Sequence, residues 1–204
     1  MNQHFIQLVV GLFIAHLLLW ASFAWQPVSF WIIFSFALFI LIGISIGFGS
    51  LNNRMIMITF GQLLLAVGSG VGLYALFAFG KFLIEWLNLP FLTQLNALYA
   101  LVQPIEWWHF LVLFLIVIPG EELFWRGFVF QKLRFWMKPV PAIFLSTVLY
   151  AVAHIYAGTL LLLVAALVAG PVWAYLYYRT ENMVIPIVSH SIFNLFLLVL
   201  FPLL

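Results

Sequence analysis

The chain has 204 residues, of which 67% are hydrophobic and only 6% are charged. A soluble domain carries about 25% charged residues, so this composition excludes an ordinary soluble protein and predicts a multi-pass membrane protein in contact with the lipid bilayer. Cysteine is absent, which excludes disulfides, thiolate metal ligands and a cysteine nucleophile. The net charge of +2 comes from few groups, so it does not indicate nucleic-acid binding and bears instead on membrane orientation.

The apolar stretches predict an all-α, polytopic bundle of about seven transmembrane helices. A span needs about 20 apolar residues, and such stretches cover residues 5–24, 28–48, 55–79, 105–135, 140–156, 160–178 and 183–203. Residues 81–104 mix charged, polar and aromatic side chains, which predicts an interfacial connector with short amphipathic helices. We expect one integrated membrane domain with an N-terminal part, residues 1–104, and a C-terminal bundle, residues 105–204. No basic segment precedes the first apolar stretch, so no cleavable signal peptide is expected.

The basic residues between the predicted spans indicate how the chain is oriented in a cell membrane. With seven spans, Lys81 falls on the side opposite the N-terminus. The residues that fall on the N-terminal side are Arg54, Lys132, Arg134, Lys138 and Arg179. Because cytoplasmic loops carry an excess of Lys and Arg, this asymmetry predicts a cytoplasmic N-terminus.

Some polar or small residues in the spans are interpreted as structural. Gly68 and Gly72 have the small-xxx-small spacing that lets two helices approach closely, so we expect them at a helix–helix contact. His16 stands alone in its span and is expected to form a hydrogen bond to a neighbouring helix. His109 lies near the end of its span and is expected to be solvated.

The sequence PGEELFWRG in the fourth span places two adjacent carboxylates in an almost uncharged background. A charge at membrane depth costs at least a few kcal/mol, so such residues are functional candidates. Arg126 follows Glu122 by four residues and can pair with it on one helix face, whereas Glu121 lies about 100° away and has no such partner. Pro119 and Gly120 predict a break that puts Glu121 in the first turn of a helix, where the macrodipole favours its ionised form.

Two further polar stripes occur in the later spans. Tyr150 and His154 are four residues apart, as are His190 and Asn194, so each pair shares one helix face. Polar faces within a membrane must meet each other or line a wet cavity, and we therefore expect them to meet the glutamates at an intramembrane cavity. With a rise of about 1.5 Å per residue, Glu121 and His154 lie at similar depth, in the inner half of the membrane.

These residue types support hydrolysis by one of two schemes. In the first, Glu121 with a neutral His154 deprotonates water, and His190 and Asn194 donate hydrogen bonds to the developing oxyanion. In the second, Glu121, His154 and His190 supply the ligand count of an open zinc site, with water as the fourth ligand. The sequence contains no Gly-x-Ser-x-Gly motif for a covalent mechanism.

Three motifs occur in order: Glu-Glu-x-x-x-Arg at 121–126, aromatic-x-x-x-His at 150–154 and His-x-x-x-Asn at 190–194. Together they resemble the CPBP family of intramembrane proteases, which includes the type II CAAX prenyl endopeptidases and the bacteriocin-processing or immunity (Abi) proteins. The resemblance covers about residues 105–201. It implies a helical membrane fold with an intramembrane catalytic cavity.

The resemblance also implies a role for each motif residue. Glu121 corresponds to the glutamate that activates water, assisted by His154. The residues implied for oxyanion stabilisation are His190 and Asn194, and those implied for the geometry of the site are Glu122 and Arg126. The second motif usually begins with Phe, and Tyr150 adds a hydroxyl near His154. Family members are described both as metalloproteases and as metal-independent glutamate proteases. The resemblance therefore does not decide whether a zinc ion is bound.

The sequence therefore predicts an intramembrane endopeptidase that cleaves a membrane-associated or lipidated protein or peptide near the inner face. Processing of prenylated CAAX proteins, maturation of bacteriocins or signal peptides, and removal of C-terminal sorting tags all remain possible. One alternative is a non-catalytic immunity or scaffold protein of the same family. Another is a proton-coupled transporter, although the sequence shows no repeated half with paired broken helices.

Overall fold

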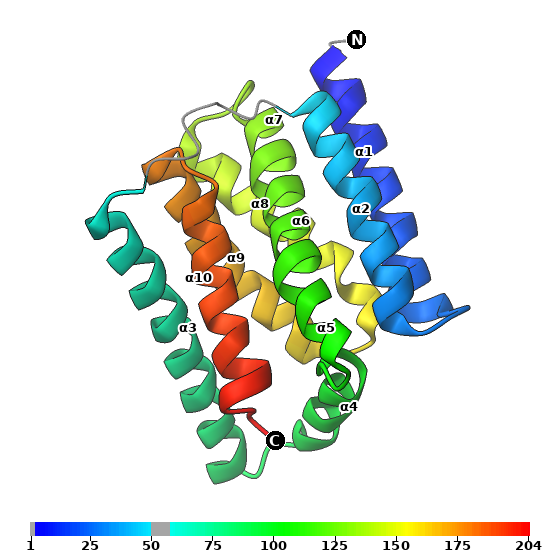
Figure 1. The fold of residues 1–204 in the computed structure, drawn as a ribbon, viewed down its shortest axis with the longest axis vertical. Helices are drawn as coiled ribbons and strands as arrows, with labels where there is room; N and C mark the ends of the chain where they lie inside the picture. Colours follow the sequence, from blue (N-terminus) through cyan, green and yellow to red (C-terminus); the bar gives the residue numbers. More distant parts are fainter. Residues whose placement is uncertain (1–2, 50–57) are drawn as a thin grey trace.

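The computed structural model describes residues 3–49 and 58–204, and this part of the chain forms a helical bundle (Figure 1). The predicted turn at 52–54 and the predicted start of the third span lie outside the described residues. Six described helices are long and apolar enough to cross a membrane: Gln3–Trp25, Phe30–Phe48, Phe60–Trp86, Trp107–Leu133, Pro139–Ala157 and Leu160–Thr180. The shorter apolar helix Val184–Leu200 takes the place of the seventh span. The predicted all-α bundle of about seven spans is thus confirmed.

The elements follow the chain with few interruptions. Those of the N-terminal part are α1 (Gln3–Trp20), η1 (Ala21–Trp25), α2 (Phe30–Phe48), α3 (Phe60–Trp86) and α4 (Leu92–Val102). The central rod consists of α5 (Trp107–Val112), η2 (Leu113–Val117), α6 (Ile118–Glu122), η3 (Leu123–Phe130) and α7 (Gln131–Leu133). The remaining elements are α8 (Pro139–Ala153), η4 (Ile155–Ala157), α9 (Leu160–Thr180), α10 (Val184–Asn194) and η5 (Leu195–Leu200).

The helices surround the central rod, and the two ends of the chain lie at opposite ends of the bundle (Figure 1). α1 and α2 pack together on one flank, α3 packs along α10 on the other, and α8 packs along α9. α4 is a short helix at the end of the bundle where the C-terminus lies. The prediction of a short helix in the connector is confirmed, but the third span continues to Trp86 instead of ending at residue 79.

The predicted helix break at Pro119 and Gly120 is wrong. Val117 and Ile118 keep right-handed helical backbone angles, and the chain is helical without interruption from Trp107 to Leu133. Two π-helical stretches, η2 and η3, flank α6. Such wide turns accommodate a proline, whose missing N–H and bulky ring disturb a regular α-helix. Glu121 therefore lies within a long helix, so the predicted influence of a helix start does not apply, because that influence is confined to the terminal turn.

The prediction that Gly68 and Gly72 mediate helix packing is also wrong. A Cβ atom added at either position would meet nothing within 4 Å. Gly70, on another face of α3, makes the close approach: a Cβ there would lie 2.5 Å from the backbone oxygen of Ser189 on α10. The spacing of small residues correctly indicated that another helix approaches α3 closely. The position of α10 decides which face of α3 makes that contact.

The two isolated histidines have different outcomes. His16 Nδ1 lies 3.1 Å from the hydroxyl of Tyr156, which confirms the predicted hydrogen bond to a neighbouring segment. His109 is buried, so the prediction that it is solvated is wrong. Its ring stacks on Trp31 with centroids 4.7 Å apart, and its Nδ1 accepts hydrogen bonds from the backbone N–H groups of Ile105 and Glu106. His109 therefore accepts hydrogen bonds from N–H groups that would otherwise lack a partner at the start of a helix.

Candidate active site

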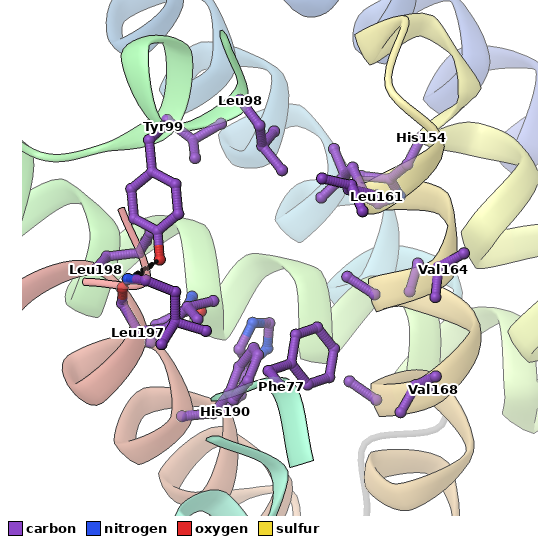
Figure 2. Close-up of a pocket in the computed structure, with 18 of the residues that line it drawn as sticks. Phe77, Leu98, Tyr99, His154, Leu161, Val164, Val168, His190, Leu197 and Leu198 are labelled. Atoms are coloured by element: carbon purple, nitrogen blue, oxygen red, sulfur yellow. Dashed lines mark hydrogen bonds between the residues drawn. The ribbon is translucent and has the colours of Figure 1, made fainter. Parts of the chain in front are cut away.

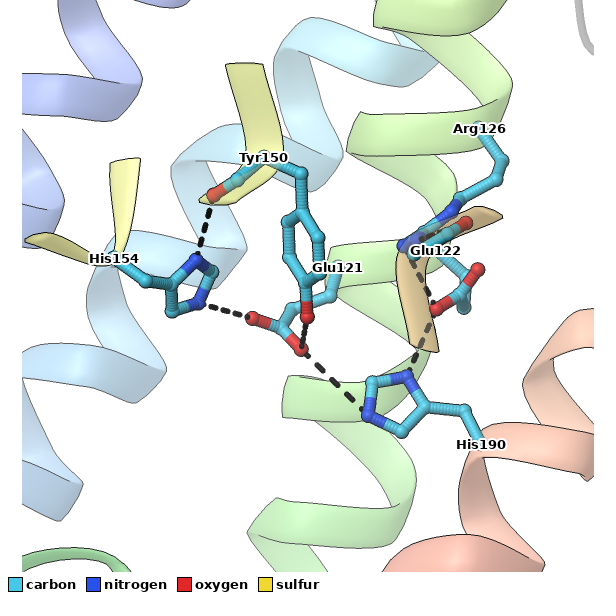
Figure 3. A network of polar contacts seen from close by, with 7 residues as sticks. Glu121, Glu122, Arg126, Tyr150, His154 and His190 are labelled. Atoms are coloured by element: carbon cyan, nitrogen blue, oxygen red, sulfur yellow. Dashed lines mark hydrogen bonds and ion pairs between the residues drawn. The ribbon is translucent and has the colours of Figure 1, made fainter. Parts of the chain in front are cut away.

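The end of helix α8 aims His154 at Glu121. The backbone N–H of His154 bonds to the carbonyl of Ala151, three residues back, so the carbonyl of Tyr150 lacks the partner that a continuing helix would supply. The imidazole takes that role, with Nδ1 donating to the Tyr150 carbonyl at 2.8 Å. This bond turns the other ring nitrogen, Nε2, toward the central rod, 3.3 Å from Oε1 of Glu121 (Figure 3).

His190 of helix α10 approaches the same carboxylate from the other side. Its Nδ1 lies 2.8 Å from Oε1 of Glu122, and its Nε2 lies 3.9 Å from Oε2 of Glu121 (Figure 3). The indole of Trp173 stacks on the imidazole, with centroids 3.7 Å apart and planes 15° from parallel. The ring of His190 is thus fixed by one carboxylate and one aromatic face while it bridges the two glutamates.

Glu122 and Arg126 form the fixed pair that their spacing predicted. Their side chains are 0% and 2% exposed, and Arg126 Nη1 donates to Glu122 Oε1 at 3.0 Å. Nη2 donates to the carbonyl of Gly170 at 3.2 Å, and the guanidinium lies over the rings of Tyr150 and Trp173, 4.7 and 5.3 Å from their centroids. The guanidinium therefore contacts helices α8 and α9 from its position on the central rod.

The hydrogen bonds of His154 determine which ring nitrogen faces Glu121. A carbonyl oxygen can only accept, so His154 Nδ1 carries a hydrogen, and in the neutral imidazole Nε2 is then an unprotonated acceptor. A lone pair on Nε2 cannot bond to an ionised carboxylate at 3.3 Å. The pair forms a hydrogen bond only if one additional proton is present, on the imidazole or on the carboxyl group. The two side chains are therefore placed to share one hydrogen bond.

Tyr150 and Asn194 complete the set of predicted site residues in different ways. The Tyr150 hydroxyl donates to Oε2 of Glu121 over a long distance of 3.5 Å. Asn194, at the end of α10, is half-buried and lines the adjacent pocket. No hydrogen bond to its side chain is formed within the described part of the chain. The structure therefore brings six of the seven predicted residues into one network, and Asn194 stands beside that network.

The network forms one wall of a pocket of about 440 Å³ (Figure 2). Such a volume lies within the usual range of about 300–1,000 Å³ for small-ligand sites. The polar wall consists of Glu121, Tyr150, His154, His190 and Asn194. Most of the remaining surface is apolar, with contributions from α3, α4 and α9; residues labelled in Figure 2 include Phe77, Leu98, Leu161, Val164 and Val168. The predicted cavity is thus present, and its lining also includes Lys81 and Tyr99, outside the polar wall.

The predicted metal ligands meet only part of the requirements of a zinc site. Both histidines use Nδ1 in a hydrogen bond, which leaves Nε2 toward Glu121, as is usual for metal-binding histidines with an outer carboxylate or carbonyl partner. However, the described residues include no group of three His, Cys, Asp or Glu side chains arranged to hold an ion. No step of the chemistry below passes through a metal ion.

Two residues that shape the site were missed by sequence reasoning. Trp173 stacks on His190, and Gly170 offers its carbonyl to Arg126. A Cβ atom at Gly170 would lie 3.0 Å from Thr147 Cγ2, so the glycine also lets α9 approach α8. The only local signal was Pro171, a proline inside an otherwise apolar helix. It marks an unusual segment but does not identify the neighbours.

A carboxylate paired with histidine at the wall of an apolar membrane pocket has the features of a hydrolytic site. Residues 103–196, which contain all seven predicted site residues, match the family described as Type II CAAX prenyl endopeptidase Rce1-like. The predicted resemblance is thus confirmed for this region. At the level of the family, the match indicates a CAAX-type intramembrane protease. No curated protein and no solved structure matches the chain.

Proposed function

We propose that this protein is an intramembrane endopeptidase that hydrolyses a peptide bond in a membrane-associated or lipidated protein or peptide. The observation that carries the proposal is the position of Glu121. Its carboxylate lies at the wall of an apolar pocket, with one histidine on each oxygen: His154 at 3.3 Å and His190 at 3.9 Å. A structural ion pair has no need of a pocket or of a second histidine.

Water is the nucleophile in the proposed reaction. Glu121 accepts a proton from water as the oxygen attacks the substrate carbonyl, and it later returns that proton to the departing amine nitrogen. His154 holds the second proton of the pair and balances the charge on the carboxylate as the first proton moves. The products are a carboxylic acid and an amine, and the two residues end in the protonation state in which they began.

Oxyanion stabilisation is assigned to His190 and Asn194. The carboxylate of Glu122 accepts from Nδ1 of His190 and can balance a positive charge on the ring, so that a protonated Nε2 can donate toward the pocket. Asn194 lines the pocket and has an amide group free to donate. Preorganised donors of this kind typically contribute about 10²–10³-fold each to the rate.

The buried pair of Glu122 and Arg126 is assigned the task of holding this geometry. Glu122 orients His190 directly, and Arg126 fixes Glu122 while it contacts Gly170 and the ring of Tyr150. Since a misplacement of about 1 Å can lower a rate by about 10²-fold, a rigid partner for each reacting group is a requirement of the mechanism. These two residues do not need to touch the substrate.

The central test replaces Glu121 with Gln, which retains the shape of the side chain but cannot accept a proton. Peptides released from membranes of cells that carry the wild type or the Glu121→Gln variant are compared by mass spectrometry, with and without a chelator. We expect the cleavage products to fall by about 10²–10⁴-fold in the variant, the range attributed to general acid–base catalysis. Thermal unfolding in detergent, measured in parallel, is expected to remain close to that of the wild type.

The same test separates the alternatives. Undiminished cleavage by Glu121→Gln would overturn the assignment of Glu121. A cellular phenotype that survives this substitution together with His154→Ala, in a protein that releases no peptide, would indicate the non-catalytic immunity or scaffold protein. Activity that a chelator abolishes and added zinc restores would show that a metal ion takes part.

A further inference from the structure

His154 does not lie in the regular part of its helix. α8 ends at Ala153, and His154 follows with backbone angles φ −91° and ψ 0°, in the sparsely populated bridge region. The next three residues, Ile155–Ala157, form the 3₁₀ turn η4, and the backbone N–H of Ala157 donates to the carbonyl of His154 at 3.1 Å. The direction of the imidazole therefore depends on the position of this short turn.

The turn η4 has few means of fixing its own position. A short 3₁₀ turn has poorer hydrogen-bond geometry than an α-helix. None of the three residues of η4 is buried, and Ile155 is 57% exposed. Contacts with other elements of the bundle therefore have to hold the turn in place, and with it His154.

The first helix of the chain supplies such a contact. η4 packs against α1 and η1 as well as against its chain neighbours α8 and α9. His16 Nδ1 of α1 lies 3.1 Å from the hydroxyl of Tyr156, and the two rings meet edge to face with centroids 5.8 Å apart. Because a polar side chain in apolar surroundings needs a hydrogen-bond partner, each of these two residues satisfies the other. One hydrogen bond thus ties the turn after His154 to α1.

The same N-terminal segment also reaches the imidazole itself. Phe23 of η1 is 8% exposed, and its ring centroid lies 5.9 Å from that of His154. Phe23 belongs to an aromatic cluster with Phe30 and Phe34, at centroid distances of 5.2 and 5.4 Å. The ring of Tyr150, 4.6 Å from the same imidazole, comes from α8. His154 is therefore contacted both by its own helix and by the N-terminal part of the chain.

We propose that His16 is a positioning residue for His154: its hydrogen bond to Tyr156 holds η4, and η4 sets the direction of the imidazole toward Glu121. His16 lies outside residues 103–196, so the N-terminal helix is a part of the active site that the family match does not include. The effect of His16 on rate rests on the proposed peptidase function. Its effect on the ring of His154 is measured without any reaction.

The first test is a double-mutant cycle on the hydrogen bond between α1 and η4. His16→Leu and Tyr156→Phe each remove the bond, and His16→Asn keeps a polar atom at the place of Nδ1. We expect the release of Glu121-dependent peptides from membranes to fall by up to about 10²-fold in the two single variants, the loss attributed to a displacement of about 1 Å. The double variant should be no worse than either single variant, because both changes remove the same interaction. His16→Asn should retain most of the activity.

Gln7→Leu is the matched control, because Gln7 ties α1 to a different part of the bundle. Its Oε1 accepts a hydrogen bond from Lys132 Nζ of α7 at 2.7 Å. It lies about 14 Å along α1 from His16, at a rise of 1.5 Å per residue. We expect peptide release and thermal unfolding in detergent to stay near those of the wild type.

Three results of the cycle would overturn the positioning role. The first is undiminished peptide release in both His16→Leu and Tyr156→Phe. The second is an equal loss in Gln7→Leu, which would indicate that any weakening of α1 has the same effect. The third is a further loss in the double variant beyond that of either single variant. Tyr156→Phe, which removes one oxygen atom, remains informative if His16→Leu lowers the unfolding midpoint.

Nitrogen-15 NMR of histidine-labelled protein separates this inference from the proposed reaction. The chain has five histidines, and His154→Ala assigns the signals of His154 by their loss. The Nδ1 signal reports the hydrogen bond to the carbonyl of Tyr150. We expect this signal to move in His16→Leu and Tyr156→Phe and to stay in place in Gln7→Leu.

The signal decides the positioning role even where activity does not. An unmoved signal in both His16→Leu and Tyr156→Phe would overturn that role, whatever their activity. A moved signal in a protein whose wild type releases no product of the proposed reaction would support the positioning of His154 and count against the peptidase function alone.

Discussion

Two adjacent glutamates on the central rod face different surroundings, and the contrast separates a reacting region from a supporting one. Glu121 lies at the wall of a pocket, where its neighbours are two histidines and a tyrosine hydroxyl at 3.3–3.9 Å. Glu122 is fully buried and bonds to Arg126 and His190 at 3.0 and 2.8 Å. The same side chain thus serves two purposes, because burial and partners, not residue type, determine what a carboxylate can do.

The contrast extends along the whole rod. On the side that precedes Glu121, Leu113 and Val117 line the pocket, and on the side that follows Glu122, aromatic side chains fill the space between the helices. A reacting group needs room for a substrate, whereas a buried charge pair needs close neighbours that satisfy its hydrogen bonds. The change from pocket to close packing occurs between two consecutive residues, Glu121 and Glu122.

The largest effect on folding is expected from the supporting region. In Arg126→Ala, Glu122 loses its cationic partner while it remains buried, and breaking a buried pair in this way costs about 3–5 kcal/mol. We expect a lower free energy of unfolding and a marked drop in the thermal midpoint in detergent. Glu121→Gln is the matched control, because Glu121 faces a pocket. The free energy of unfolding of this variant is expected to stay close to that of the wild type. Equal destabilisation of both variants would contradict the division between the two regions.

An intermediate effect, on activity alone, is expected from Asn194. Its amide lines the pocket and takes no part in the hydrogen-bond network of the two glutamates. Asn194→Ala should therefore lower kcat by about 10²–10³-fold, as for the loss of one oxyanion donor, with little change in KM. Thermal unfolding should stay near that of the wild type. A change confined to KM would instead assign Asn194 to substrate binding.

The smallest effect is expected at Tyr150, which touches both regions. Its ring lies under the Arg126 guanidinium, and its hydroxyl reaches Glu121 only at 3.5 Å. Tyr150→Phe keeps the ring and removes the long hydrogen bond, so we expect less than a tenfold change in peptide release and an unfolding midpoint within a few degrees of the wild type. Tyr150→Ala provides the contrast, because the loss of a buried aromatic ring costs about 3–5 kcal/mol. A large loss of activity in Tyr150→Phe would make the hydroxyl part of the mechanism.

The sequence by itself determined the membrane class, the approximate number of spans and the residues that meet in the site. These follow from local properties: the length of apolar stretches, the four-residue repeat of a helix, and the high free energy of isolated polar groups in lipid. The pairing of Glu122 with Arg126 also follows, since both lie on one helix face. Motif order was sufficient to indicate the resemblance that the match over residues 103–196 confirms, because the three motifs occur in order in the fourth, fifth and seventh spans.

The sequence did not determine which face of a helix is used or how the backbone adapts. Gly70 rather than Gly68 or Gly72 meets a neighbour because α10 lies on that side of α3. Pro119 does not interrupt its helix because wide turns flank it. Trp173 became part of the site only through packing of α9 against α10, which brings residues distant in sequence into contact.

Only the tertiary structure decided on which side of the two glutamates the pocket lies. Glu121 and His154 lie at similar depth, as helix rise and spacing predict, and His190 reaches the same carboxylate from α10, but the pocket beside them is the space that packed side chains leave unfilled. Buried aromatic residues fill the space after Glu122, and the pocket lies on the other side, lined by residues of α3, α4 and α9. Helical periodicity describes the faces of single helices, whereas a cavity is a property of how several helices fit together.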